Sequence, residues 1–247
     1  MARSWIGTSG WSYDHWRGPF YPSGLKRGDW IGYYARQFAT VEINASFYRP
    51  PAATTLAGWV AKTPDDFVFA VKAWRAITHF RRLRDCADLL AGFLDRLAPL
   101  GDKLGPLLVQ LPPRFHLDLA RLDAFLALLP QGRRFAFEFR DPSWHGDAVH
   151  ERLADHGAAF CPFELGAARG PRVATADFVY VRLHGREPGY RGDYDDAALA
   201  DWAVWLGDQL GQGRDAYVYF DNTGEGDAAL RNARRLAELV AVVRLAH

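Results

Sequence analysis

The sequence predicts an α/β protein, a single (β/α)8 TIM barrel that spans residues 1–247. Short runs rich in β-branched and aromatic residues alternate with amphipathic helical stretches, which is typical of parallel strands. There are eight such runs, and a chain of 247 residues is long enough to close them into one barrel. No repeat, low-complexity segment or polar linker indicates a second domain.

The predicted elements follow one another along the whole chain. The expected strands are residues 5–9, 40–44, 67–72, 107–112, 135–139, 158–163, 178–184 and 216–222. The clearest expected helices are residues 56–63, 89–100, 120–129, 198–210 and 229–243. The sixth unit is irregular, because residues 164–177 show little helical periodicity.

A long segment rich in aromatic residues follows the first strand. Residues 9–29 contain no clear helix or strand, and loops of this length are usually functional or mobile. Its aromatic residues, and those that follow strands two, three and five, are Trp11, Tyr13, Trp16, Phe20, Tyr21, Phe47, Tyr48, Trp74 and Trp144. They could wall a pocket that stacks a sugar or a base, or they could form a hydrophobic plug over the barrel.

Composition and charge narrow the class of protein. The chain is 49% hydrophobic and has a formal net charge of +1, which gives no general attraction to nucleic acid or to an anionic membrane. Cys86 and Cys161 form no metal-spaced cluster and fit reduced thiols. The N-terminus has no apolar signal core, and no run of about 18 apolar residues could span a bilayer. A cytoplasmic protein is expected.

The stretch FAFEFRDPSW, residues 135–144, shows how a strand divides its side chains between two faces. Successive strand residues point to opposite sides, so the three phenylalanines share one face and Ala136, Glu138 and Arg140 share the other. In a barrel the bulky apolar face packs against the helices, and the inward face reaches the active site at its C-terminal end. Glu138 and Arg140 are therefore expected at the mouth.

The same alternation on the other strands places polar residues near the same end. They are Glu42, Asn44, Lys72, Gln110, Arg182, His184, Tyr219 and Asp221. Together with Glu138 and Arg140 they include three carboxylates and three permanent cations. The charges of the group therefore balance without a ligand. The cations would compete with a metal for the carboxylates, so no protein-bound metal is expected.

Two interpretations of this group remain open. The polar residues could be a structural ion-pair network that closes the top of the barrel. Alternatively, Glu138, His184 and Lys72 are catalytic and move protons, and Arg140 and Arg182 hold an anionic substrate. In the second case the remaining substrate-binding residues are Glu42, Asn44, Asp221, Asn222, Gln110, Tyr48, Trp11 and Trp144. No nucleotide-binding or zinc-protease motif occurs, so no cofactor is expected.

Several motifs together resemble the YecE-like family, a domain of unknown function. They are GTSGWSYDHWRGPFYP at 7–22, VEINASFYRPP at 41–51, LLVQLPPRF at 107–115, FEFRDPSW at 137–144, YVRLHG at 180–185 and YVYFDNTGEGDAALRNA at 217–233. The resemblance implies a TIM barrel and no established reaction. Family members resemble endonuclease IV and xylose isomerase in shape, but this sequence has one inward histidine where the nuclease type needs several.

The leading hypothesis is an enzyme that performs acid–base chemistry on a small anionic molecule, phosphorylated, carboxylated or nucleotide-derived, at the mouth of the barrel. It would be a hydrolase, lyase or isomerase without a redox cofactor. One alternative is a nucleic-acid binder or metal-dependent nuclease, which the near-neutral charge disfavours. Another is a ligand sensor without catalysis. No feature of the sequence specifies an oligomeric state.

Overall fold

The computed structural model describes residues 1–245, whose strands form two five-stranded sheets. One sheet has the order β1-β10-β9-β7-β8 and the other β2-β3-β4-β5-β6. The strands are β1 Ser4–Thr8, β2 Thr40–Ile43, β3 Val68–Lys72, β4 Leu104–Leu111, β5 Phe135–Phe139, β6 Ala159–Phe160, β7 Phe163–Leu165, β8 Ala168–Arg169, β9 Phe178–Leu183 and β10 Asp215–Phe220. All pairings are parallel except β7 with β8, so the predicted α/β class with parallel strands is confirmed.

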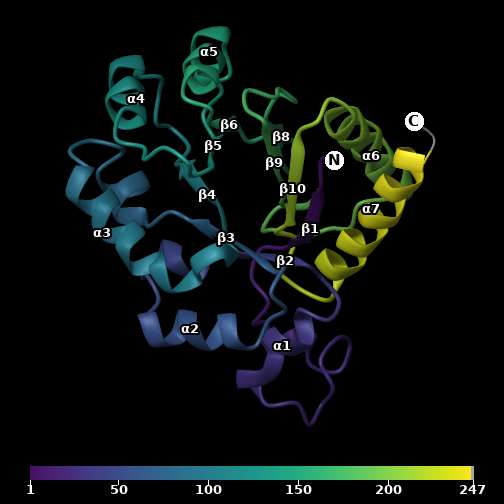
Figure 1. The fold of residues 1–247 in the computed structure, drawn as a ribbon. Helices are drawn as coiled ribbons and strands as arrows, with labels where there is room; N and C mark the ends of the chain where they lie inside the picture. Colours follow the sequence, from purple (N-terminus) through teal and green to yellow (C-terminus); the bar gives the residue numbers. More distant parts are fainter. Residues whose placement is uncertain (246–247) are drawn as a thin grey trace.

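Helices lie around the outside of the strands (Figure 1). They are α1 Trp30–Tyr34, α2 Ala53–Ala61, α3 Ala87–Leu97, α4 Leu119–Leu126, α5 Asp147–Asp155, α6 Asp196–Gly211 and α7 Ala228–Leu245. Five of them match the stretches expected from periodicity, to within three residues at each end. Neither α1 nor α5 was expected, and with five residues α1 is too short to show a clear helical period.

The sixth unit departs from the prediction. In place of one strand at 158–163, the chain pairs first with β5 as β6 and then with β9 as β7. The Cys161 amide donates to the Phe137 carbonyl at 2.8 Å, and the Arg182 amide donates to the Pro162 carbonyl at 3.1 Å. Pro162 has no amide hydrogen of its own, and the strand breaks at this residue. The expected absence of a helix here agrees with the structure, in which a β7–β8 hairpin follows.

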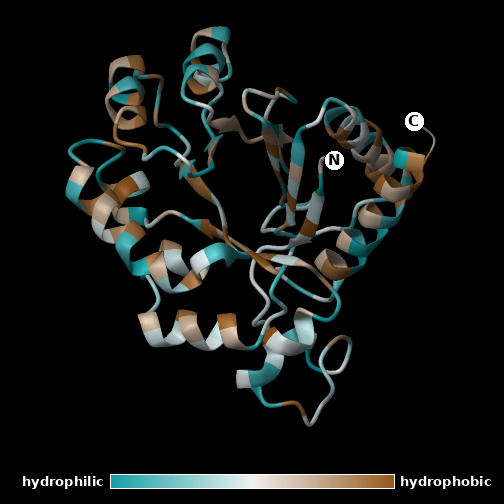
Figure 2. Ribbon diagram, viewed as in Figure 1, coloured by the Kyte–Doolittle hydropathy of each residue, from teal (hydrophilic) through white to brown (hydrophobic). Residues whose placement is uncertain are grey.

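The strands separate two hydrophobic clusters. Phe135, Phe137 and Phe139 belong to the larger one, which includes buried residues of the helices. Ala136 belongs to the smaller one, with Ala70, Leu108, Tyr180, Tyr217 and Tyr219 on the opposite face of the strands. Figure 2 shows helices that carry both hydrophobic and hydrophilic residues, as expected when one face of each packs on the sheets. The alternation read from residues 135–140 therefore describes two packed faces.

The aromatic segment after β1 is largely core. It contains the short 3-10 helices η1 Asp14–Trp16 and η2 Arg27–Asp29, where no element was expected. Trp16 and Tyr21 are fully buried, and Tyr21 stacks on Trp30 with ring centroids 4.4 Å apart. Trp16 and Tyr21 therefore belong to the hydrophobic packing and do not form the wall of a pocket. Within the described part of the chain, no helix has both the length and the apolar character needed to cross a bilayer.

Candidate functional site

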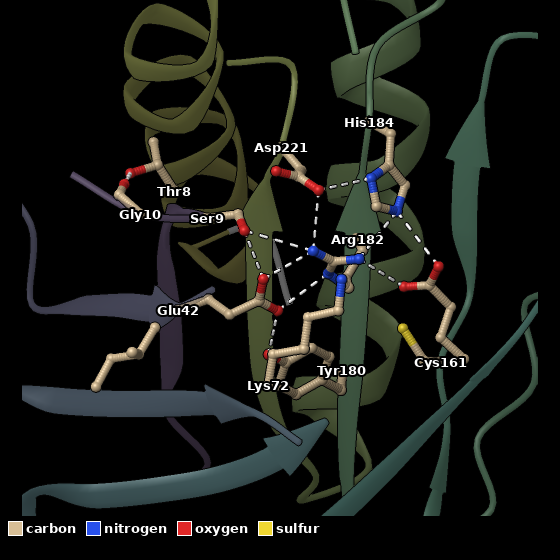
Figure 3. A network of polar contacts seen from close by, with 12 residues as sticks. Thr8, Ser9, Gly10, Glu42, Lys72, Cys161, Tyr180, Arg182, His184 and Asp221 are labelled. Atoms are coloured by element: carbon tan, nitrogen blue, oxygen red, sulfur yellow. Dashed lines mark hydrogen bonds and ion pairs between the residues drawn. The ribbon is translucent and has the colours of Figure 1, made fainter. Parts of the chain in front are cut away.

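Arg182 lies at the centre of a buried cluster of charged residues (Figure 3). Its Nε donates to Glu42 Oε2 at 3.0 Å and its Nη2 to Glu42 Oε1 at 2.8 Å. Nη1 donates to Glu138 Oε2 at 2.9 Å, and Nη2 also donates to Asp221 Oδ2 at 2.9 Å. These side chains lie at alternate positions of their strands, which all point to the same face. They meet there around Arg182, as strand alternation predicts.

Glu42 is fully buried and is held by four hydrogen bonds. Besides the two from Arg182, Ser9 Oγ donates to Oε1 and Tyr180 Oη donates to Oε2, each at 2.6 Å. Ser9 also forms an isolated parallel bridge with Glu42 through the backbone, at the junction of the two sheets. All of the carboxylate's strong acceptor directions are therefore used inside the protein.

Glu138 is fully buried between two arginines. Although burial acts to raise the pKa of its carboxyl, the guanidinium groups of Arg140 and Arg182 hold that pKa well below its ordinary value. Glu138 is therefore a permanent anion at neutral pH. A carboxylate in this state balances charge and fixes the direction of Arg140, but it is a poor proton carrier.

His184 is also fully buried, and both of its ring nitrogens contact charged side chains. Nε2 lies 3.0 Å from Arg140 Nη2 and 3.4 Å from Arg182 Nη1, and a guanidinium nitrogen can only donate. Nε2 also lies 3.5 Å from Glu138 Oε1, and Nδ1 lies 2.9 Å from Asp221 Oδ2. Both ring nitrogens are occupied by protein groups.

A cavity of about 730 Å³ lies beside this cluster, at the C-terminal ends of the strands. Its volume is within the range of small-molecule sites. The predicted site residues that line it are Asn44, Tyr48, Lys72, Gln110, Arg140 and Asp221. Glu42, Glu138, Arg182 and His184 do not line it; they form a buried layer adjoining Arg140 and Asp221.

Lys72 is the last residue of β3 and has little exposure, 8%. Among residues 1–245 its amine has no hydrogen bond or ion-pair partner, and Nζ lies 4.4 Å from the centre of the Phe47 ring. Burial and the nearby charge of Arg182 lower its pKa to about 8, against the opposing effects of Asp221, Glu42 and Glu138. A sizeable fraction of the amine is therefore uncharged at mildly alkaline pH.

Arg140 and Asp221 each keep one atom free beside Lys72. Arg140 uses Nε and Nη2 on Glu138 and His184, and its Nη1 has no hydrogen bond within residues 1–245. Asp221 uses Oδ2 on Arg182 and His184, which together hold its pKa at about 2 against the effect of burial. Asn44 adds a buried Oδ1 without a partner in the described chain. Such unsatisfied groups fit a site that is completed by a ligand.

Five predicted substrate-binding residues need correction. Glu42 does not line the cavity, and both of its oxygens accept from protein groups. Arg182 is fully buried and all its donor groups face protein acceptors, so it has none to offer an anion. Trp144 is fully buried in the core, stacks on Phe139 and donates from Nε1 to the Phe115 carbonyl at 2.5 Å. It follows β5 on the helix side of the strand, which alternation alone did not reveal.

Asn222 and Trp11 also lie away from the main cavity. Asn222 donates to the Gly192 carbonyl and to Asn232 Oδ1, at 2.9 and 3.0 Å, and so ties the loop after β9 to α7. Trp11 packs edge-on against Trp59 and lines a separate, smaller cavity of about 330 Å³. Tyr48 lines both cavities and is 62% exposed, at their rim.

Among the residues that line the cavity, sequence reasoning missed the titratable side chains of His79 and Tyr190. His79 belongs to a π-helical turn, η4 Ala76–Phe80, after β3. Burial and the charges of Lys72 and Arg140 lower its pKa to about 4, so it is neutral. Tyr190 has a left-handed backbone with φ of 62° and packs edge-on against His184. A π-helical turn and a strained residue are both typical of functional sites, but neither has a sequence signal.

A second cavity of about 530 Å³ lies between β7, β8 and α6. Its charged residues are paired with one another: Arg169 with Glu164, Arg172 with Asp201 and Arg186 with Asp195. These pairs are mostly exposed, so they differ from the free groups beside Lys72. Among residues 1–245, no group of three or more His, Cys, Asp or Glu side chains is placed to hold a metal ion.

Comparison with known proteins identifies the family. The profile described as "Protein of unknown function DUF72" matches residues 5–246, nearly the whole chain. The chain belongs to the DUF72 family. This agrees with the motifs read from the sequence and adds no reaction. The cluster around Arg182 and the adjoining cavity are therefore features of a DUF72 protein whose chemistry has to be argued from its geometry.

Relatives of this DUF72 chain extend over most of its length. The UPF0759 protein YunF of Bacillus subtilis is 28% identical over 96% of this chain and 94% of its own. The UPF0759 protein YecE of Escherichia coli K12 is 32% identical over 62% of this chain and 54% of its own. The crystal structure of a DUF72 protein from Thermotoga maritima superposes with a TM-score of 0.87 at 27% identity, covering 97% of this chain and 99% of that one.

Proposed function

We propose that this DUF72 protein is an enzyme that performs acid–base chemistry on a small anionic substrate in the cavity beside Lys72. The observation that carries the proposal is a pair of unused donors, the amine of Lys72 and Nη1 of Arg140, that belong to residues lining a cavity of about 730 Å³. Lys72 is a largely buried cation without an ion-pair partner in residues 1–245, which is costly for a protein, and Arg140, although paired with Glu138, keeps one donor group unused. An anion that binds both groups offsets that cost.

The proposed site includes closure of the two sheets into a (β/α)8 barrel. The backbone bridge between Ser9 and Glu42 joins the β1 and β2 sides, and residues 159–165 pair with β5 and then with β9. Two bridges at opposite edges support one continuous ring of strands. In such a barrel the reactive groups lie at the C-terminal ends of the strands, where Lys72, Arg140 and Asp221 lie.

The roles proposed here differ from those expected from sequence. Lys72 is the group that exchanges protons, because its lowered pKa brings both protonation states close to neutral pH. Arg140 binds the anionic group of the substrate through Nη1. Glu138 and His184, which do not reach the cavity, are positioning residues that aim Arg140 and Asp221. Arg182 neutralises the carboxylates beneath them.

The test is turnover of a small anion by the purified protein. A metabolite extract is incubated with the wild-type chain, with Lys72→Met and with Lys62→Met, and anionic metabolites are followed by mass spectrometry. We expect at least one anion to be consumed by the wild type and by Lys62→Met, whose substitution lies on the exposed surface, and not by Lys72→Met. An extract left unchanged by the wild type, or changed equally by Lys72→Met, overturns the proposal.

A further inference from the structure

The four lysines of the chain have different surroundings, and Lys72 differs from the other three. Lys103 is equally buried, but its amine donates to the carbonyls of Val60 and Thr63 at 2.9 and 2.8 Å. Lys62 donates to the Gly28 carbonyl and pairs with Asp29, and Lys26 is exposed on the surface. Only the Lys72 amine combines burial, a cavity in front of it and no acceptor within residues 1–245.

We propose that Lys72 forms a Schiff base with a 2-oxo acid, whose carboxylate is bound by Nη1 of Arg140. This inference rests on the proposed function and narrows its substrate class to small acids that carry a carbonyl beside the carboxylate. The amine supplies the nucleophile, and the free guanidinium edge selects the charge of the substrate.

The surroundings of Lys72 shift its equilibrium from the ammonium ion toward the neutral amine. The charged groups that act on it are Arg182, Asp221, Glu42 and Glu138. Arg140 is a further cation that lines the same cavity. His79, the other titratable group facing it, is neutral. The carboxylates of this set are engaged by Arg182, so they stabilise the ammonium form less than free carboxylates would. The pKa of Lys72, about 8, leaves the reactive form accessible near neutral pH.

The step balances as follows. The nitrogen lone pair of neutral Lys72 bonds to the carbonyl carbon, and the electron pair of the C=O bond passes to oxygen. The oxygen takes up a proton and the nitrogen releases one, which gives the neutral carbinolamine. The carbinolamine then loses its hydroxyl as water, after a second protonation, and the C=N bond forms. Overall, the lysine ammonium and the 2-oxo acid give the protonated imine and one water molecule. No oxidant, reductant or metal takes part.

Asp221 and Asn44 line the same cavity as Lys72 and offer polar groups to a bound substrate. Asp221 presents Oδ1, an ionised acceptor, and Asn44 presents its amide beside the same cavity. An ionised carboxylate close to the imine stabilises the positive charge that forms on nitrogen. The Lys72 amine lies over the Phe47 ring, and both residues line the cavity.

Reductive trapping tests the inference on the wild-type protein. The intact chain is incubated with pyruvate, glyoxylate or 2-oxoglutarate, reduced with sodium cyanoborohydride, digested and mapped by mass spectrometry. Hydride addition to the imine carbon leaves a stable secondary amine, so the modified peptide gains the mass of the acid less one oxygen atom. We expect the Lys72 peptide to be labelled about tenfold more than those of Lys26, Lys62 or Lys103 with at least one acid.

Two controls sharpen the test. Acetone, which has the carbonyl of pyruvate without its carboxylate, should label Lys72 about tenfold less because it cannot pair with Arg140. Lys72→Arg retains a positive charge without a nucleophilic amine and should lose the label at this peptide. Equal labelling of all four lysines, or no adduct at Lys72 with any of the three acids, overturns the inference. If the extract assay still shows turnover that depends on Lys72, only the Schiff base is wrong and the proposed function stands.

Discussion

Arg182 on β9 and Glu42 on β2 form a two-point ion pair that connects the two sheets. The guanidinium Nε and Nη2 face the two carboxylate oxygens at 3.0 and 2.8 Å, and both side chains are fully buried. The same guanidinium also binds Glu138 from the sheet of β2 and Asp221 from the sheet of β10. One arginine therefore fixes the relative position of four strands at the end where the cavity lies.

The first prediction concerns the loss of this arginine. Arg182→Met removes the guanidinium that pairs with Glu42, Glu138 and Asp221, and these carboxylates stay buried. Because buried charges without a partner are costly, we expect the free energy of unfolding to fall by about 3–5 kcal/mol. The measurement is urea unfolding at pH 7. Arg235→Gln, which breaks an exposed pair with Asp196, should leave the unfolding midpoint close to that of the wild type. A midpoint for Arg182→Met equal to that of Arg235→Gln contradicts the central role of Arg182.

The second prediction concerns pH and Asp221. Its pKa in the folded protein, about 2, lies below the value near 3.9 of an unfolded aspartate, so its ionised form stabilises the fold above about pH 4. This contribution is lost as the pH falls from about 4 to about 2. Asp221→Asn should therefore cost about 2 kcal/mol at pH 7, and the difference from the wild type should shrink toward pH 2.

Urea unfolding at a series of pH values checks this behaviour. Asp201→Asn serves as the matched control, because Asp201 is an aspartate in an exposed pair with Arg172 and should change stability little at any pH. A difference between the wild type and Asp221→Asn that stays constant from pH 7 to pH 2 would show that the ionisation of Asp221 does not stabilise the fold.

The third prediction is that the proposed reactive lysine destabilises the protein. The folded pKa of Lys72, about 8, lies below the value near 10.4 of an unfolded lysine, so the charged amine opposes folding at neutral pH. As the pH rises from about 8 to about 10.4 the folded state releases its proton first, and the wild type gains stability. Lys72→Met should thus be about 1–3 kcal/mol more stable than the wild type at pH 7.

Thermal and urea unfolding at pH 7 and pH 10 test this prediction. The advantage of Lys72→Met should be smaller at pH 10, and the surface variant Lys62→Met should show neither effect. If Lys72→Met is less stable than the wild type at pH 7, the amine has a stabilising partner and the account of an unpaired lysine is wrong.

The fourth prediction separates a core tryptophan from a tyrosine at the rim. Trp144→Phe keeps an aromatic ring against Phe139 but removes the hydrogen bond to Phe115, and we expect a loss of about 1–3 kcal/mol in unfolding free energy. Tyr48→Ala, at an exposed position, should leave stability nearly unchanged. Trapping of pyruvate on Lys72 should respond in the opposite way, weakened by Tyr48→Ala and unaffected by Trp144→Phe. The reverse pattern would place Trp144 in the site.

Strand alternation predicted which side chains converge, and it did so because the period of two is a local property of extended chain. Glu138 and Arg140 lie on one face together with the polar residues at matching positions of the other strands. The same face carries Ala136, Ala70 and Tyr180. Helix periodicity likewise located α2, α3, α4, α6 and α7. The short α1 and α5 and the break at Pro162 depend on packing and pairing with distant strands, which leave no comparable pattern.

The sequence by itself determined the α/β class, the family and the composition of the charged group. Only the tertiary structure decided which charges are free. Arg140 and Arg182 are both arginines at even strand positions, yet Arg182 is surrounded by carboxylates from three other strands while Arg140 keeps Nη1 for the cavity. The physical reason is that ion pairing and burial depend on neighbours that come from different strands. The sequence alone therefore does not distinguish an arginine held in an ion pair from one that is free to bind a ligand.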